Sequence, residues 1–275
     1  MLVDEAFAAI QRLLPQHGLT RAAGWLGSAT APWIKVPLVR AFAAAYQVDL
    51  SEAARGNLTD YLSFNDFFTR ELKPSARPLP DDERTICCPA DGTISQSGRI
   101  EGGRMLQAKG WRYSLSGLAP DLGEGFDGGQ FATIYLAPRD YHRVHAPATG
   151  RLTDARAIPG ALFSVNAATE NAVEGLFCRN ERLVCRLRTD LGDLLVVLVG
   201  ALIVGSIATP WPGPQSPYRR AETFRPGAPL ERGAELGRFL LGSTVILCCP
   251  PKVCELDALK AGQKVRMGMP IGRWV

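Results

Sequence analysis

Several familiar sequence patterns are missing from the chain, and their absence narrows the class of protein. The longest apolar run, from Leu194 to Gly205, is far shorter than the ~20 residues that a bilayer-spanning helix needs. The amino terminus carries Asp4 and Glu5 where a secretory signal peptide has a basic segment followed by an apolar one. We therefore expect neither a transmembrane helix nor a signal peptide.

The cysteines also lack the spacing of a metal or disulfide site. Seven are present, at positions 87, 88, 178, 185, 248, 249 and 254, and none forms a CxxC pair. Two pairs are adjacent in sequence, which suits neither a zinc site nor a disulfide framework. We expect small, buried, apolar thiols in a reducing compartment, and no metal.

Charge is nearly balanced over the chain as a whole. The 275 residues include 46% hydrophobic and 21% charged residues, which excludes a disordered chain. A net charge of +4 is too small to indicate a nucleic-acid partner, and none is expected. The same small excess of positive charge is compatible with binding to an anionic lipid surface.

Acidic residues are absent between Glu5 and Asp49, and this stretch has the periodicity of short amphipathic helices. Its polar faces are basic, and Trp25 and Trp33 lie at their edges, a pattern typical of the membrane interface. We therefore expect residues 1–60 to form membrane-associating helices. A helical cap packed on the protein's own core is the alternative.

After this region the pattern changes to short strands separated by glycine and proline. Ser63 should open a short aromatic helix, residues 73–80 should cross in extended form into the main domain, and residues 211–217 should form a loop. Strands are expected at 131–136, 183–187, 194–199, 245–248 and 265–274. The predicted fold class is α+β, with short N-terminal amphipathic helices followed by a mostly antiparallel β domain.

Four residues are candidates for chemistry. His142 and His145 follow the strand at 131–136, Asp91 lies in a tight turn, and Ser243 follows Gly242 in an apolar strand. Each has a structural alternative, and an Asx turn is the simplest explanation of the aspartate. The nucleophile elbow G-x-S-x-G is absent, which disfavours an α/β-hydrolase.

Taken together, a series of short motifs resembles the phosphatidylserine decarboxylases of the bacterial proenzyme type. The motifs occur in family order and are Phe64–Arg70, Pro89–Gly92, Gln107–Gly110, Tyr141–His145, Phe163–Asn166, Arg179–Arg182, Val199–Ala201, Val204–Ile207 and Gly237–Thr244. The basic, tryptophan-bearing N-terminal helices also resemble the membrane-binding segment of that family.

The resemblance implies that the chain cuts itself at Gly242-Ser243. Asp91, His145 and Ser243 would form the processing triad, in which the histidine takes the proton of the serine hydroxyl. The serine oxygen would attack the Gly242 carbonyl, and elimination would leave a covalent pyruvoyl cofactor at residue 243. The products would be a large chain, residues 1–242, and a small chain, residues 243–275, both belonging to the β domain beyond residue 60.

The implied second reaction converts phosphatidylserine to phosphatidylethanolamine and carbon dioxide. The pyruvoyl carbonyl derived from Ser243 would form a Schiff base with the lipid amine. His142 is a candidate for proton transfer or for contact with the carboxylate, and Phe163–Asn166 is a candidate pocket wall. We expect the protein on the cytoplasmic side of the cell membrane, bound peripherally to an anionic surface. The sequence is compatible with a homodimer.

Three alternatives remain at this point. The chain could be a pyruvoyl decarboxylase of another amino-linked substrate, a non-catalytic membrane-binding β domain, or a serine hydrolase of external substrates. A single uncut chain would favour the second. A Ser243 that stays a serine and reacts with a fluorophosphonate probe would favour the third.

Overall fold

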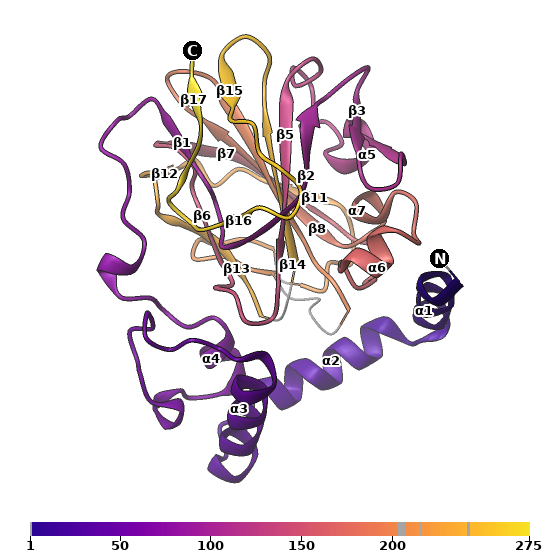
Figure 1. The fold of residues 1–275 in the computed structure, drawn as a ribbon, viewed down its shortest axis with the longest axis vertical. Coiled ribbons are helices and arrows are strands. Elements are labelled where there is room, and N and C mark those ends of the chain that lie inside the picture. Colours follow the sequence, from indigo (N-terminus) through magenta and orange to yellow (C-terminus); the bar gives the residue numbers. More distant parts are fainter. Residues whose placement is uncertain (1, 203–206, 215, 241–242) are drawn as a thin grey trace.

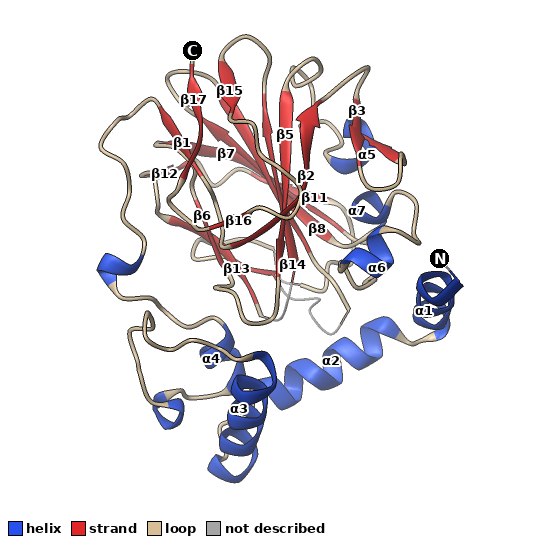
Figure 2. Cartoon of the chain, viewed as in Figure 1, coloured by secondary structure: helices blue, strands red, loops and turns tan. Residues whose placement is uncertain are grey.

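A computed structural model describes residues 2–202, 207–214, 216–240 and 243–275, and shows the N-terminal helices at one end of a β domain and three short helices beside its sheet (Figures 1 and 2). The helices are α1 (Leu2–Leu13), α2 (Gln16–Gly27), α3 (Pro32–Tyr46), α4 (Phe64–Phe68), α5 (Leu115–Leu118), α6 (Ala167–Glu170) and α7 (Leu176–Arg179). Single 3-10 turns lie at Leu58–Asp60 and Pro74–Ala76.

The strands belong to one large sheet and three small ones. The large sheet has the order β11-β7-β8-β9-β14-β5-β2-β16, with β12 also paired to β7, and its pairs are antiparallel. The small sheets have the orders β1-β17-β15, β10-β13-β6 and β3-β4. The strands are β1 (Thr85–Cys87), β2 (Gly92–Arg99), β3 (Arg104–Leu106), β4 (Arg112–Ser114), β5 (Gln130–Leu136), β6 (Arg143–His145), β7 (Gly150–Ile158), β8 (Arg182–Arg188), β9 (Asp193–Val199), β10 (Ile207–Ala208), β11 (Glu222–Phe224), β12 (Ala228–Leu230), β13 (Glu235–Phe239), β14 (Ser243–Cys249), β15 (Cys254–Leu256), β16 (Lys264–Val265) and β17 (Pro270–Trp274).

Both faces of the large sheet are buried, which explains why its central strands are apolar throughout. In β9, Leu194 and Val196 face one core, whereas Leu195 and Val197 face the other. The same alternation separates the adjacent Cys248 and Cys249, because successive side chains of a strand point to opposite faces. All seven cysteines are free and six are buried, as predicted.

Most of the predicted elements are confirmed, with two differences at the carboxyl-terminal end. The stretch 265–274 is two strands, because the chain turns at Gly268, whose φ of 85° is a conformation that glycine adopts readily. Ser243 opens β14 instead of lying inside a strand, and Gly242 lies outside the described residues. The described residues of the loop 211–217 form no regular element.

The N-terminal helices have a small core of their own. Ser63 caps α4 by accepting a hydrogen bond from the backbone N–H of Asp66, as the sequence predicts. The aromatic side chains of α4 then pack with α3 around the buried Val39, Tyr61 and Phe67. This cluster extends to Phe68, and the domain boundary at residue 60 stays a prediction.

Large apolar side chains are exposed mainly on these helices. In the described part of the chain, ten of them lie before residue 63 and five after it. The ten are Phe7, Ile10, Leu13, Leu14, Leu19, Trp25, Leu26, Trp33, Tyr46 and Leu62. Trp25 and Trp33 are 74% and 78% exposed, so neither ring packs on the protein's own core. The exposure favours the membrane-interface interpretation over a simple helical cap.

The architecture confirms the predicted α+β class, with short helices first and a mostly antiparallel β domain after them. A search of the described helices finds none long and apolar enough to span a bilayer.

Candidate active site

The end of α4 fixes the segment that carries two of the candidate residues. The ring of Phe68 lies 4.1 Å from the imidazole of His142, measured between centroids. Nη2 of Arg70 donates to the backbone carbonyl of Arg139 at 2.9 Å. The Phe-Phe-Thr-Arg motif therefore joins the helical unit to the histidine segment.

Strand alternation places the Ser243 side chain on the face of the sheet that the histidine strand covers. Ser243 pairs with Leu136 of β5 and lies two residues before Val245, which belongs to the core shared with Val144. Val144 is in β6, between the two candidate histidines. The serine and both histidines therefore lie on one side of the large sheet.

His145 is held by two hydrogen bonds that define its tautomer. Nδ1 lies 2.7 Å from the carbonyl oxygen of Gly233, which can only accept, so Nδ1 carries the proton. Nε2 then accepts from the hydroxyl of Tyr141 at 3.0 Å. Burial lowers the pKa of His145 below its usual value, opposed by the Gly233 carbonyl and by the negative charge of Glu235. The ring is thus a neutral base whose lone pair is occupied by Tyr141.

His142 has the same tautomer but an empty lone pair. Nδ1 lies 2.9 Å from the backbone carbonyl of Asp140, so this nitrogen is the donor. Nε2 is buried and has no hydrogen-bond partner among the described residues. Complete burial lowers the pKa of His142 to about 3, and the nearby positive charge of Arg70 also lowers it.

Asp91 is paired with an arginine that the sequence analysis did not consider. Its Oδ1 accepts from Nε of Arg77 at 2.9 Å and from the backbone N–H of Met267 at 2.8 Å, and its Oδ2 accepts from Nη2 of Arg77. Arg77 also contacts Glu52 at 2.9 Å. The aspartate is thus fixed by side-chain and backbone partners distant in sequence, and these contacts differ from those of an Asx turn.

The structure brings the three proposed triad residues to one region without joining them by hydrogen bonds. The backbone N–H of His145 donates to the carbonyl of Pro89 at 2.8 Å, which aligns β6 with the chain just before Asp91. The hydroxyl of Ser243 is fully buried and has no partner among the described residues. Gly242, the other side of the proposed cleavage site, lies outside them, and the triad and cleavage site stay predictions.

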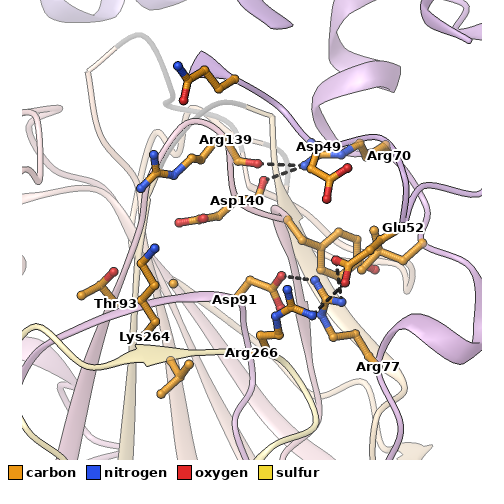
Figure 3. Close-up of a pocket in the computed structure, with 15 residues that line it drawn as sticks. Asp49, Glu52, Arg70, Arg77, Asp91, Thr93, Arg139, Asp140, Lys264 and Arg266 are labelled. Carbon is orange, nitrogen blue, oxygen red and sulfur yellow. Dashed lines mark hydrogen bonds and ion pairs between the residues drawn. The ribbon is translucent and has the colours of Figure 1, made fainter. Parts of the chain in front are cut away.

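Besides a cavity of about 320 Å³ lined by Tyr141, His145 and Gly233, two others flank this region. One, of about 330 Å³, lies beside Asp91 and is lined by charges of both signs, including Asp140, Lys264 and Arg266 (Figure 3). The other, of about 470 Å³, lies beside Leu240, three residues before Ser243. Its lining includes Ile207 and Trp211, which belong to the core on the serine's side of the sheet.

Comparison with known proteins assigns the family. The model of the family described as phosphatidylserine decarboxylase matches residues 64–273, and a second model, named PSD, matches residues 6–47. The chain belongs to the phosphatidylserine decarboxylase family. One relative is the phosphatidylserine decarboxylase proenzyme of Pseudomonas entomophila strain L48, which is 51% identical over 273 residues that cover 95% of each chain. Another is the phosphatidylserine decarboxylase proenzyme of Pseudomonas aeruginosa strain LESB58, which is 50% identical over 276 residues that cover 96% of each chain. The proenzyme of Bordetella avium strain 197N is 47% identical over 274 residues, which are 96% of this chain and 93% of its own.

The family match confirms the resemblance on which the residue assignments depend, and the structure gives the motif Arg179–Arg182 a physical role. In Arg179–Arg182, the Asn180 side chain donates to the carbonyls of Phe163 and Gly200, each at 2.8 Å. The buried Glu181 accepts from the Ser216 hydroxyl and from the backbone N–H of Tyr218. This motif therefore holds the loops around the end of β9.

Sequence analysis missed Arg77, Tyr141 as a partner of His145, and the roles of Asn180 and Glu181. Tyr141 lies in the family motif Tyr141–His145, and Asn180 and Glu181 lie in Arg179–Arg182. Their place as polar residues within these motifs is the signal that could have indicated them. Arg77 lies in the proline-rich crossing, where only its isolation among prolines marks it.

We expect the burial of His142 to make the precursor less stable in acid. Its folded pKa is about 3 against about 6.5 unfolded, so between these values the unfolded chain binds more protons and stability falls as pH falls. The test uses the uncut Ser243→Ala protein with and without His142→Phe. Between pH 6 and pH 5, the free energy of unfolding measured in urea should fall by about 1 kcal/mol more when His142 is present. An equal fall in the free energy of unfolding of both proteins would contradict the lowered pKa of His142.

Proposed function

We propose that this phosphatidylserine decarboxylase matures by cutting itself at Gly242-Ser243 and then decarboxylates phosphatidylserine at a membrane surface. Family membership supports the decarboxylase activity. The observation that carries the maturation step is the buried Ser243 hydroxyl, which has no hydrogen-bond partner among the described residues and lies on the same side of the sheet as both histidines.

In the proposed maturation, His145 takes the proton of Ser243, and the serine oxygen attacks the carbonyl carbon of Gly242. The acyl group moves from nitrogen to oxygen and gives an ester. A base then removes the Cα proton of residue 243, the bond between Cβ and the ester oxygen breaks, and residue 243 becomes dehydroalanine. The oxygen leaves with Gly242 as a carboxylate. Water then replaces the nitrogen of the dehydroalanine, which is released as ammonia. Because the attacked peptide is already tethered, proximity supplies much of the rate.

For direct proton transfer, the Tyr141 hydroxyl has to leave Nε2 of His145, which it occupies at 3.0 Å. The lone pair is then free for the serine proton. Asp91, fixed by Arg77, supports the positive charge that forms on the ring, since its negative charge favours the protonated form.

Ser243 fits the position of a pyruvoyl cofactor because its side chain is enclosed. Its hydroxyl makes no hydrogen bond with a described residue, so formation of the cofactor would break none of these contacts. When formed, the group supplies a ketone that captures the lipid amine and accepts the electrons left by loss of carbon dioxide. The cavity beside Leu240 is our proposed place for the lipid headgroup. It lies on the serine's side of the sheet, whereas Phe163 of the predicted pocket wall belongs to the opposite core.

We assign proton transfer during decarboxylation to His142. Its Nε2 is unprotonated and buried, and no described residue binds it, which leaves its lone pair for a bound substrate. Contacts from Phe68 and Asp140 fix the ring, which suits a group that must meet a substrate in one orientation.

The exposed apolar side chains before residue 63, together with the exposed cations Arg12, Arg21 and Arg40, support peripheral binding to an anionic membrane. This places the catalytic domain beside a substrate that leaves the bilayer reluctantly, at ~0.8 kcal/mol per buried CH₂. The proposed organisation is residues 1–60 for membrane association, 61–242 for the rest of the large chain and 243–275 for the small chain, on the cytoplasmic side.

Purified protein should consist of residues 1–242 and a 33-residue chain blocked at its start by pyruvate. Ser243→Ala should remain one uncut chain, because the attacking oxygen is gone. Thr244→Val, which removes the next buried hydroxyl on the strand, should still be cut. Intact mass spectrometry measures all three, and an uncut active wild type would contradict the proposal.

His142→Gln should be cut like the wild type but decarboxylate about 10²–10⁴-fold more slowly, the range for loss of a general acid–base group. Product formation is measured on the separated, correctly cut protein. Normal turnover in this variant would remove His142 from the mechanism.

Trp25→Ala combined with Trp33→Ala should weaken binding to anionic vesicles by about tenfold or more, because two exposed rings lose their place among the headgroups. Leu191→Ala is the control, since Leu191 is exposed at the turn between β8 and β9. Vesicle flotation measures the affinity. Unchanged binding of the double variant would oppose the assigned surface.

A further inference from the structure

Helix α1 has two faces with different surroundings. Phe7, Ile10 and Leu13 are exposed, and Leu13 is 86% exposed. On the other face, Gln11 is only 1% exposed and contributes to a contact with the β domain around α6. A long polar side chain is rarely buried without a specific partner, so the contacts of Gln11 show what this helix does.

Two glutamines of the N-terminal helices bind the backbone of one distant segment. Oε1 of Gln11 accepts from the N–H of Ser164 at 2.7 Å, and its Nε2 donates to Oγ1 of Thr169 at 3.2 Å. Oε1 of Gln16 accepts from the N–H of Leu162 at 2.8 Å. Its Nε2 donates to the backbone carbonyl of Gln11 at 2.9 Å, which ties the Gln16 side chain to the end of α1. The backbone N–H groups of Leu162 and Ser164 therefore donate to side chains of helices that are distant in sequence.

The same segment is bound from its other side to the end of strand β9. The Asn180 side chain donates to Phe163 and to Gly200, each at 2.8 Å. Gly200 follows Val199, which pairs across the ladder with Thr244, the residue after Ser243. One segment thus lies between the proposed membrane helix and the strand that opens at the reactive serine.

Glu181 extends these contacts to the loop beside Leu240. Its backbone N–H donates to Ala161 at 2.9 Å, and its buried carboxylate binds Ser216 and the backbone N–H of Tyr218. Ser216 also lines the cavity beside Leu240. Residues 161–166 therefore connect α1 both to the start of β14 and to that cavity.

We propose that Gln11 and Gln16 are positioning residues that couple docking of α1 on a bilayer to the arrangement of residues 161–166, and through Asn180 and Glu181 to the reaction centre. The coupling rests on the membrane association proposed above. Because linkage is reciprocal, a bilayer that holds α1 also favours the ordered segment, and a ligand that orders the segment strengthens docking. The mature enzyme should then be activated by a membrane that contains no substrate.

The test separates membrane binding from activation. Mature enzyme is assayed on a short-chain phosphatidylserine kept monomeric in solution, with and without phosphatidylglycerol vesicles. We expect the vesicles to activate the wild type about fivefold or more, the ratio expected from one or two net hydrogen bonds. Gln11→Met and Gln16→Met keep side-chain length and lose the amide, so they should bind the vesicles normally and be activated less than twofold.

Gln263→Met is the matched control, because Gln263 is exposed and its side chain also accepts a backbone hydrogen bond, from Lys260 at 3.0 Å, away from residues 161–166. It should be activated like the wild type. Full activation of both Gln11→Met and Gln16→Met, or no activation of the wild type, would overturn the coupling. A wild type that is uncut and inactive would instead refute the proposed function, so the two failures are distinguishable.

Hydrogen exchange of the unmodified protein gives a measurement that does not depend on the folding of any variant. Addition of phosphatidylglycerol vesicles should slow exchange of the backbone N–H groups of Leu162 and Ser164 together with those of α1. Slower exchange in α1 with no change at residues 161–166 would overturn the coupling.

Discussion

The proposed reaction centre depends on one buried hydroxyl, that of Ser243, for which the described residues offer no hydrogen-bond partner. An unsatisfied buried polar group costs about 1–3 kcal/mol, and Ser243 is held in this state at the start of β14, where its backbone pairs with Leu136 of β5. The pairing of β14 with β9 begins one residue later, at Thr244. The proposed maturation transfers this oxygen to Gly242 and removes the unsatisfied group. In the proposed maturation, strand pairing thus holds the serine hydroxyl in place for attack.

The parts of the fold that could be predicted are those that depend on neighbouring residues. Alternating and continuous apolar patterns predicted the strands, and Ser63 with Asp66 predicted the start of α4. The order of short motifs predicted the family and the candidate residues. The turn at Gly268 was missed because the flanking segments have the same strand-like composition.

Contacts between distant residues could not be predicted in the same way. Arg77 binds Asp91, and Gln11 binds Ser164 across 153 positions, but neither arginine nor glutamine has a distinctive local pattern. Only the folded chain shows that Tyr141 occupies the nitrogen of His145 that the proposed chemistry requires. Sequence can name the reactive groups, whereas their states of protonation and access depend on packing.

Strand pairing also explains how the chain would remain one protein after the proposed cut. Strand β14 lies between β5 and β9, with seven paired residues on one side and five on the other. Further along the proposed small chain, β16 pairs with β2 and β17 pairs with β1. Breaking one peptide bond before Ser243 leaves all these pairings and both cores in place. The proposed cut therefore leaves the small chain held to the large one by strand pairing.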